Sequence, residues 1–245
     1  MRFLCLLLFA TSLWATPPGF MSQPIPGLIA YWPFMEGSGL VANDLSGFNS
    51  PMVLSNAPAW SNGIVGNAVD FNGTTQSAVA QSVAYNSSII TISCFFKANR
   101  YLASDTFLYE SSPNANNLTA AFYLDFAAAD VRVFLNGVTG DAARRLVSFA
   151  KPTTNVWHHM AVVFDNSTTN GLIVPYVDGV LQATTPVFEN KNYAGNIPTT
   201  QLFLVSRANA SLFSYVDIDD FRIYNRALTQ EEVLMLYNGG YGFQR

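Results

Sequence analysis

Charged residues are scarce in this chain. Lysine, arginine, aspartate and glutamate make up 11% of its 245 residues, against about 25% in an average globular protein. The formal net charge is −4, and the few basic residues are scattered apart from the pair Arg144 and Arg145. Binding to a nucleic-acid backbone needs a basic patch, so we expect no nucleic-acid partner.

Histidine and cysteine are nearly absent. The two histidines, His158 and His159, are adjacent, and neighbouring residues of a strand point to opposite faces. They are therefore expected to be structural, which leaves Ser–His and Cys–His catalysis without another base. Cys5 lies in a segment that we expect to be removed, so Cys94, in an apolar strand-like run, is expected to be a buried free thiol. An intermolecular disulfide is the alternative.

Long apolar runs are also lacking after the N-terminus. The first 15 residues contain a positive charge at Arg2, an apolar run that is shorter than the roughly 20 residues of a membrane span, and the small residue Ala15. This pattern is typical of a secretory signal peptide (1–15), so we expect a secreted, extracellular protein without a membrane span. Residues 16–27 hold four of the twelve prolines, and we interpret them as an extended linker.

Short apolar or alternating runs make up most of the remaining sequence. Half of the residues are hydrophobic and 14% are aromatic, which is enough for a sizeable core. About a dozen such runs are separated by Gly, Asn, Ser and Pro, with no interleaved helical pattern. The expected fold is all-β, a two-sheet antiparallel sandwich or jelly roll, in one domain over residues 28–240 with a short tail at 241–245.

One helix is predicted at residues 229–237. Thr229 and Glu232 have the spacing of a capping box, and Leu228 precedes the cap as a hydrophobic staple to Val233. Gly239 and Gly240 would end the helix. Its apolar stripe is expected to pack across the edge of the sandwich.

Several segments together resemble the laminin-G-like, concanavalin A-like jelly roll. They follow one another in the order expected for that family, and the set covers nearly all of residues 28–237. These segments are LIAYWPFMEGSG, DLSG, AWSNGIVGNAVDFNG, TISCFFK, VWHHMAVVFD, YVDGVLQ and DDFRIYNRALTQEEVLMLY. The resemblance implies two stacked antiparallel sheets in which the first and last strands are neighbours.

The resemblance also implies a calcium site where the early D-x-S-G loop meets the last strand. Three carboxylates crowd that strand, and a bound cation would offset their repulsion. The alternative is that Asp219 and Asp220 point to opposite faces, one solvated and one hydrogen-bonded to a loop. The predicted ligands of a structural Ca²⁺ are Asp44, Gly47, Asn49 and Asp219.

Ligand recognition would use loops at one rim of the sandwich. Trp32, Trp60 and Trp157 match framework positions of the resembled family, so a sugar-stacking platform would draw on loop aromatics. Each of these is, taken alone, more often a loop anchor than a ligand contact. The candidate ligand-binding residues are Tyr101, Tyr193, Phe213 and Tyr215.

Catalysis is not expected. A glycoside hydrolase needs two carboxylates across a cleft, and none of the five glutamates has an alternating carboxylate partner. The sequence favours a secreted, non-enzymatic binding or adhesion module whose leading partner class is carbohydrate. A structural subunit of an extracellular assembly, which acts through contacts with an extracellular protein or through self-assembly, is the alternative. A glycan-active hydrolase or lyase is the second alternative.

Overall fold

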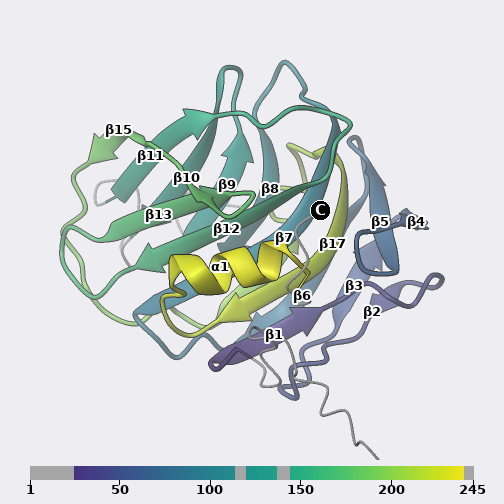
Figure 1. Ribbon diagram of the computed structural model, residues 1–245, viewed down its shortest axis with the longest axis horizontal. Helices are drawn as coiled ribbons and strands as arrows, with labels where there is room; N and C mark the ends of the chain where they lie inside the picture. The colour runs from purple at the N-terminus through teal and green to yellow at the C-terminus, as the bar shows by residue number, and fades with distance from the viewer. Residues whose placement is uncertain (1–24, 114–119, 137–143, 240–245) are drawn as a thin grey trace, which may run out of the picture.

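The protein is a sandwich of two antiparallel sheets in a computed structural model that describes residues 25–113, 120–136 and 144–239 (Figure 1). The all-β prediction is confirmed. The predicted signal peptide, the linker before residue 25 and the tail at 241–245 lie outside the described residues. Within the described ranges no helix is long and apolar enough to span a membrane.

We call the first sheet the helix-side sheet, because the helix packs on it. In the described residues its strands follow the order β14-β13-β12-β7-β17-β5-β4, and β1 also pairs with β17. The strands are β1 (Leu28–Trp32), β4 (Ala59–Asn62), β5 (Asn67–Asn72), β7 (Ile89–Arg100), β12 (His158–Asp165), β13 (Leu172–Val177), β14 (Val180–Leu181) and β17 (Tyr215–Tyr224).

The second sheet, called the opposite sheet, has the strand order β15-β11-β10-β9-β8-β16-β6-β3-β2. Its strands are β2 (Val41–Ala42), β3 (Met52–Ser55), β6 (Ser77–Val83), β8 (Thr106–Ser112), β9 (Phe122–Phe126), β10 (Asp130–Asn136), β11 (Arg144–Ala150), β15 (Thr185–Glu189) and β16 (Thr200–Leu204).

Aromatic side chains join the two sheets in the core. Tyr109 of β8 packs against Phe221 of β17, with ring centroids 5.9 Å apart, and Phe122 of β9 packs against Phe164 of β12 at 4.8 Å. All four are essentially fully buried. Cys94, on the core side of β7, is buried and unbridged, as predicted. Burial raises the pKa of its thiol far above the ordinary value, so the thiol stays protonated and inert.

The two terminal strands pair as predicted, because β1 runs antiparallel to β17 with Trp32 opposite Phe221. The hairpin between β13 and β14 turns at Asp178 and Gly179, whose φ angles of 52° and 76° suit the predicted turn.

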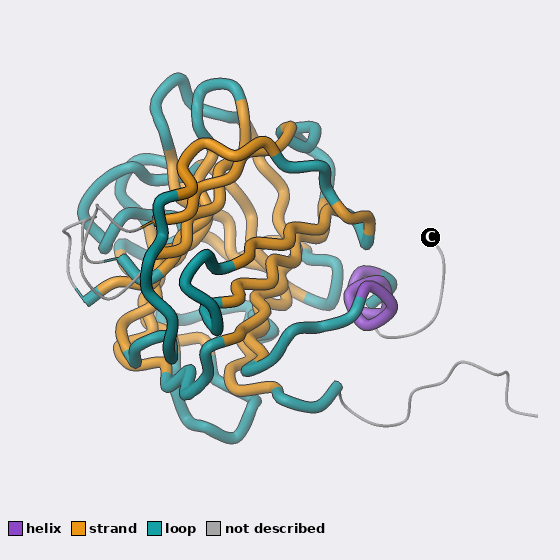
Figure 2. The backbone as a smooth tube through the Cα atoms, turned by 90° about the vertical axis from the view of Figure 1, so that its left-hand side faces the viewer, coloured by secondary structure: helices purple, strands orange, loops and turns teal. Residues whose placement is uncertain are grey.

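Helix α1 (Gln230–Tyr237) begins at the predicted capping box, in which the Thr229 side chain accepts from the Glu232 amide and the Glu232 carboxylate accepts from the Thr229 amide. The expected edge position is wrong. Val233 and Leu236 instead pack against the outer face of the helix-side sheet, on Ala161 and Tyr224. Figures 1 and 2 show the helix outside the layer of strands rather than at its margin. The outer face there carries apolar residues, and burying them against the helix stripe removes them from water.

Candidate functional site

Each of the three crowded carboxylates of β17 has partners within the protein. Asp217 accepts hydrogen bonds from Lys97 Nζ at 2.6 Å and Asn99 Nδ2 at 2.8 Å, and Asp220 pairs with Arg222 at 2.8 Å. Asp219 Oδ2 accepts from the backbone amides of the 63–66 turn. Protein groups therefore offset the charge repulsion, and all three acids are buried. The alternative is confirmed for Asp219, which is hydrogen-bonded to a loop, and is wrong for Asp220, which is buried rather than solvated.

Asp219 holds the turn at residues 63–66 against the outer face of the helix-side sheet. Its Oδ2 lies 2.7 Å from Ile64 N and 2.9 Å from Val65 N, while Oδ1 is buried without a hydrogen-bond partner. Gly63 allows this approach, because a Cβ at that position would lie 2.5 Å from the carboxylate oxygen. Burial raises the pKa of Asp219 to about 7. The carboxylate thus positions the Ile64 side chain.

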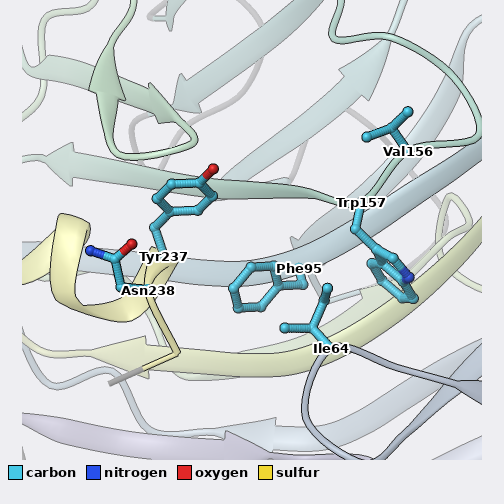
Figure 3. A pocket seen from close by; sticks show the side chains of 6 residues that line it. All are labelled: Ile64, Phe95, Val156, Trp157, Tyr237 and Asn238. Carbon is cyan, nitrogen blue, oxygen red and sulfur yellow. The ribbon is translucent and has the colours of Figure 1, made fainter. Parts of the chain in front are cut away.

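Ile64 belongs to an aromatic pocket on the outer face of the helix-side sheet (Figure 3). Its volume is about 320 Å³, at the lower end of the roughly 300–1,000 Å³ typical of ligand pockets. Phe95 of β7 is 3% exposed, whereas Trp157 and Tyr237 are partly exposed. In Figure 3 Phe95 lies between Tyr237 on one side and Ile64 and Trp157 on the other. The pocket-lining residues are Ile64, Phe95, Val156, Trp157, Tyr237 and Asn238.

Polar groups adjoin the pocket on one side. Lys97, two residues after Phe95 on β7, places its Nζ 5.2 Å from the centroid of the Trp157 ring while it binds Asp217. Asp217 lies directly across the strand pair from Asp70 of β5. Burial and the nearby Asp217 raise the pKa of Asp70, with Lys97 acting in the opposite direction. A polar strip that holds a cation and two carboxylates therefore continues the aromatic surface.

The two histidines point apart, as predicted. His158 faces the core side, where its Nδ1 lies 2.7 Å from Asp178 and its ring 6.1 Å from Phe96. His159 lies on the outer face beneath the pocket, with its ring centroid 4.9 Å from that of Phe95. Burial lowers the pKa of His159 to about 3, and Ser93 Oγ lies 2.8 Å from its Nε2. A buried, neutral imidazole has a structural role here.

The predicted calcium ligands Asp44 and Asp219 make hydrogen bonds to different loops. The carboxylate of Asp44 accepts three backbone amides, two of them within the 44–50 loop, at Ser46 and Ser50. Asp219 binds a different turn and shares no partner with Asp44. Gly47 and Asn49 are exposed with positive φ, as their loop requires. Among the described residues no group of three or more His, Cys, Asp or Glu could hold a metal ion. The calcium ion at Asp44, Gly47, Asn49 and Asp219 stays a prediction.

The four predicted aromatic ligand contacts do not form one platform. Tyr101 follows the end of β7, packs on Phe126 with centroids 5.0 Å apart and donates to Pro152 O. Tyr215 lies opposite Arg100, near the same end of β7. Tyr193 belongs to a loop that is hydrogen-bonded to Ser87 and Asn166, beside the start of β7. Because β7 is twelve residues long, this loop lies at the other end of the strand from Tyr101. Phe213, in the loop before β17, is partly buried. The contacts of Tyr101 are those of a loop anchor.

Sequence reasoning missed Phe95, Trp157 and Tyr237 as pocket residues. The segment of Trp157 matches the family and predicts a framework position, yet the ring is partly exposed in the pocket. The strand alternation that places Trp157 on the face of His159 was the available signal. Nothing local in the sequence places the end of α1 beside β7, since that contact is tertiary.

Facing carboxylates, which the sequence did not predict, occur at Asp70 and Asp217. Asp70 lines a shallow hollow of about 380 Å³ with Tyr215 and Gln76. Asp217, however, is 3% exposed and hydrogen-bonded to Lys97, Asn99 and Ser61. A carboxylate in that state is poorly placed to attack a substrate or to activate a water molecule.

Solved structures share this fold at low sequence identity. The binding domain of Paraclostridial Mosquitocidal Protein 1 matches with a TM-score of 0.65 and 17% identity, over 88% of this chain and 53% of that one. Domain 4 of AbnA, an arabinanase from Geobacillus stearothermophilus in complex with arabinotriose, matches with a TM-score of 0.64 and 18% identity, over 86% and 98%. Trypanosoma rangeli sialidase matches with a TM-score of 0.66 and 16% identity, over 89% of this chain and 34% of that one.

This chain thus spans about half of the toxin domain and a third of the sialidase. No curated protein sequence matches it significantly. The sequence profile of the Laminin_G_3 family, described as the concanavalin A-like lectin/glucanases superfamily, matches residues 71–234. The chain therefore belongs to this concanavalin A-like family of lectins and glucanases.

Proposed function

We propose that the protein is a secreted, non-enzymatic carbohydrate-binding module and that the aromatic pocket on the helix-side sheet holds a sugar ring. Secretion rests on the predicted signal peptide at residues 1–15. The observation that carries the binding proposal is the grouping of Trp157, Tyr237 and Phe95 around one pocket beside a polar strip. Sugar rings present apolar C–H faces to aromatic rings and hydroxyl groups to polar neighbours.

The polar neighbours suit hydroxyl recognition. Lys97 Nζ offers donors beside the Trp157 ring, and the Asn238 amide at the end of α1 offers both a donor and an acceptor. Ile64 closes one side of the pocket from a turn that Asp219 holds in place. The site is thus largely preformed, which lowers the entropic cost of binding.

The test is direct binding to a panel of neutral oligosaccharides that includes arabinotriose, the ligand in the AbnA domain structure. Calorimetry should detect binding to the intact chain, and Trp157→Ala should weaken it by at least about tenfold. Phe48→Ala, at an exposed aromatic outside this pocket, is the matched control and should bind normally. Unchanged affinity in a folded Trp157→Ala protein would refute this site.

The same samples test the remaining parts of the proposal. Release of reducing ends from any bound glycan would show hydrolysis and would overturn the non-enzymatic assignment. The proposal needs no calcium ion, since protein groups already offset the charges of β17. Melting in calcium and in chelator tests that point, because an ion bound only by the native state must raise the melting temperature.

A structural subunit of an extracellular assembly is the second candidate. The edge strands β14 and β15 favour it, because Val180, Leu181, Val187 and Phe188 are 42–61% exposed at the ends of the two sheets. Exposed apolar edges are ready sites for pairing with another chain. Size-exclusion chromatography at increasing concentration separates the candidates, since a monomer at every concentration removes self-assembly.

A further inference from the structure

The aromatic pocket lies where helix α1 ends. Tyr237, the last residue of the helix, and Asn238, which follows it, both line the pocket (Figure 3). Gly239 comes next with a φ of 72° and donates its amide to Leu236 O, in the left-handed conformation in which helices commonly end. Residues 240–245 lie outside the described part of the chain. Only Gly239 separates them from a residue that lines the pocket.

Residues 240–245 have the sequence GYGFQR, and we call them the GYGFQR segment. Tyr241, Phe243 and Arg245 occupy every second position, and side chains two positions apart share one side of an extended chain. Glycine fills two of the other three positions, and a residue without a side chain lets the backbone approach a surface closely. The segment therefore combines two aromatic rings and one cation in a pattern that one surface can bind.

The described residues leave apolar surface of the pocket in contact with water. Val156 at the rim is 52% exposed, and the rings of Trp157 and Tyr237 are partly exposed. Aromatic side chains that covered this surface would remove it from water. The Tyr237 ring lies 6.1 Å from the ring of His159, which lies beneath the pocket. Six extended residues span up to about 20 Å, so the GYGFQR segment is long enough to cross the pocket.

The polar strip beyond Trp157 holds more acids than bases. Lys97 lies 5.2 Å from the Trp157 ring and pairs with Asp217 at 2.6 Å. Asp70 lies opposite Asp217 and is partly exposed, and among the described residues it forms no ion pair of its own. Its closest polar neighbour is Asn99, whose Nδ2 is 3.5 Å away. Lys97 thus serves two carboxylates, and a second cation beside Asp70 would be favourable.

We propose that the GYGFQR segment folds back onto its own domain, where Tyr241 and Phe243 fill the aromatic pocket and Arg245 pairs with Asp70. The order of the groups agrees on the two sides. From the end of α1 the pocket comes first and the polar strip follows it, and in the segment the two aromatic residues precede the arginine. A docked segment would compete with a sugar. As a control on sugar access the inference rests on the proposed function, whereas the docking itself does not.

The first experiment measures acrylamide quenching of tryptophan fluorescence in the full chain. Replacing Tyr241 and Phe243 together by serine should uncover Trp157 and increase the quenching, whereas Gln244→Ser in the same segment should leave it unchanged. The increase should disappear when both proteins also carry Trp157→Phe, because the other described tryptophans do not line the pocket. Melting curves establish that each variant is folded. Equal quenching of the wild type and the double-serine variant would overturn the inference.

The second experiment is calorimetry with a synthetic GYGFQR peptide. The peptide should bind the double-serine variant at least about tenfold more tightly than the wild type, because a segment on a short link competes at an effective concentration in the millimolar range. Asp70→Asn in the protein and Arg245→Gln in the peptide should each weaken binding, and their effects should not add, since they remove the same ion pair. Fully additive effects, or equal affinity for the two proteins, would contradict the proposed contacts.

Comparison of the two experiments with sugar binding separates the possible failures. If the protection of Trp157 in the wild type is lost on dilution, the segment of a second copy fills the pocket and the inference is wrong. If the segment protects Trp157 but no oligosaccharide binds even the double-serine variant, the docking stands and the proposed function fails. If oligosaccharides bind both proteins equally and quenching is also equal, the docking fails and the proposed function stands.

Discussion

Replacing Asp219 with asparagine should change how the stability of the protein depends on pH. Asp219 is fully buried, and its side chain accepts two backbone amides of the 63–66 turn through Oδ2. An asparagine Oδ1 can accept the same two hydrogen bonds, so the turn is kept. The substitution chiefly removes the ability of the site to ionise.

The magnitude follows from the pKa of the folded state. Burial raises the pKa of Asp219 from 3.8 to about 7, a difference of about three pH units, or roughly 4 kcal/mol of free energy. Because the folded state holds the proton more tightly, the stabilising contribution of Asp219 is full below about pH 4 and is lost as the pH rises through 7. Wild-type protein should therefore lose about 4 kcal/mol relative to Asp219→Asn between pH 4 and pH 8.

Urea unfolding of both proteins across this pH range measures the difference directly, and all other titrating groups cancel in the comparison. Thermal melting is a second measurement. At about 2–4 °C per kcal/mol for a domain of this size, the difference between the two melting temperatures should change by roughly 8–16 °C from pH 4 to pH 8. Asp130→Asn, at a partly exposed strand end, controls for loss of a charge. A difference that is constant with pH refutes the reasoning. If the stability of the wild type instead increases relative to that of the variant as the pH rises, the two backbone amides stabilise the charged carboxylate more than burial destabilises it.

Two further substitutions test the packing of the fold. Thr229→Ala removes the capping box of α1 and should cost about 1 kcal/mol, or 2–4 °C in melting temperature, whereas Thr229→Ser should retain most of the stability; equal melting of all three proteins would contradict the cap. Tyr109→Phe removes a buried hydroxyl that has no hydrogen-bond partner, so it should be neutral or stabilising, and a loss above about 1 kcal/mol in urea unfolding would show that the hydroxyl has a partner.

Local patterns predicted the elements of this fold well. The capping box at Thr229 and the Asp178–Gly179 turn depend on residues only a few positions apart, and both occur as expected. The opposed directions of His158 and His159 follow from strand alternation alone. Pairing of the terminal strands came from the family resemblance and is also confirmed.

The candidate sites were predicted poorly because their members meet only through tertiary packing. Asp217 has charged neighbours in sequence, but its hydrogen-bond partners come from β7 and β4. The aromatic residues proposed for one platform lie near opposite ends of β7, at Tyr101 and Tyr193. The sequence around an aromatic residue in a loop has no periodicity, so it does not indicate at which end of the sandwich that residue lies.

The sequence by itself determined the sandwich and the start of its helix, because short-range spacing and apolar alternation are enough to specify which segments become strands. The family came from the resemblance of the quoted segments, which is also a property of the sequence. Only the tertiary structure decided which groups balance the acids of β17 and where the helix lies, and it alone brought Trp157, Phe95 and Tyr237 together. Those contacts join segments far apart in the chain, and their geometry depends on strand order, on a bulge in β17 and on the packing of α1 across one face.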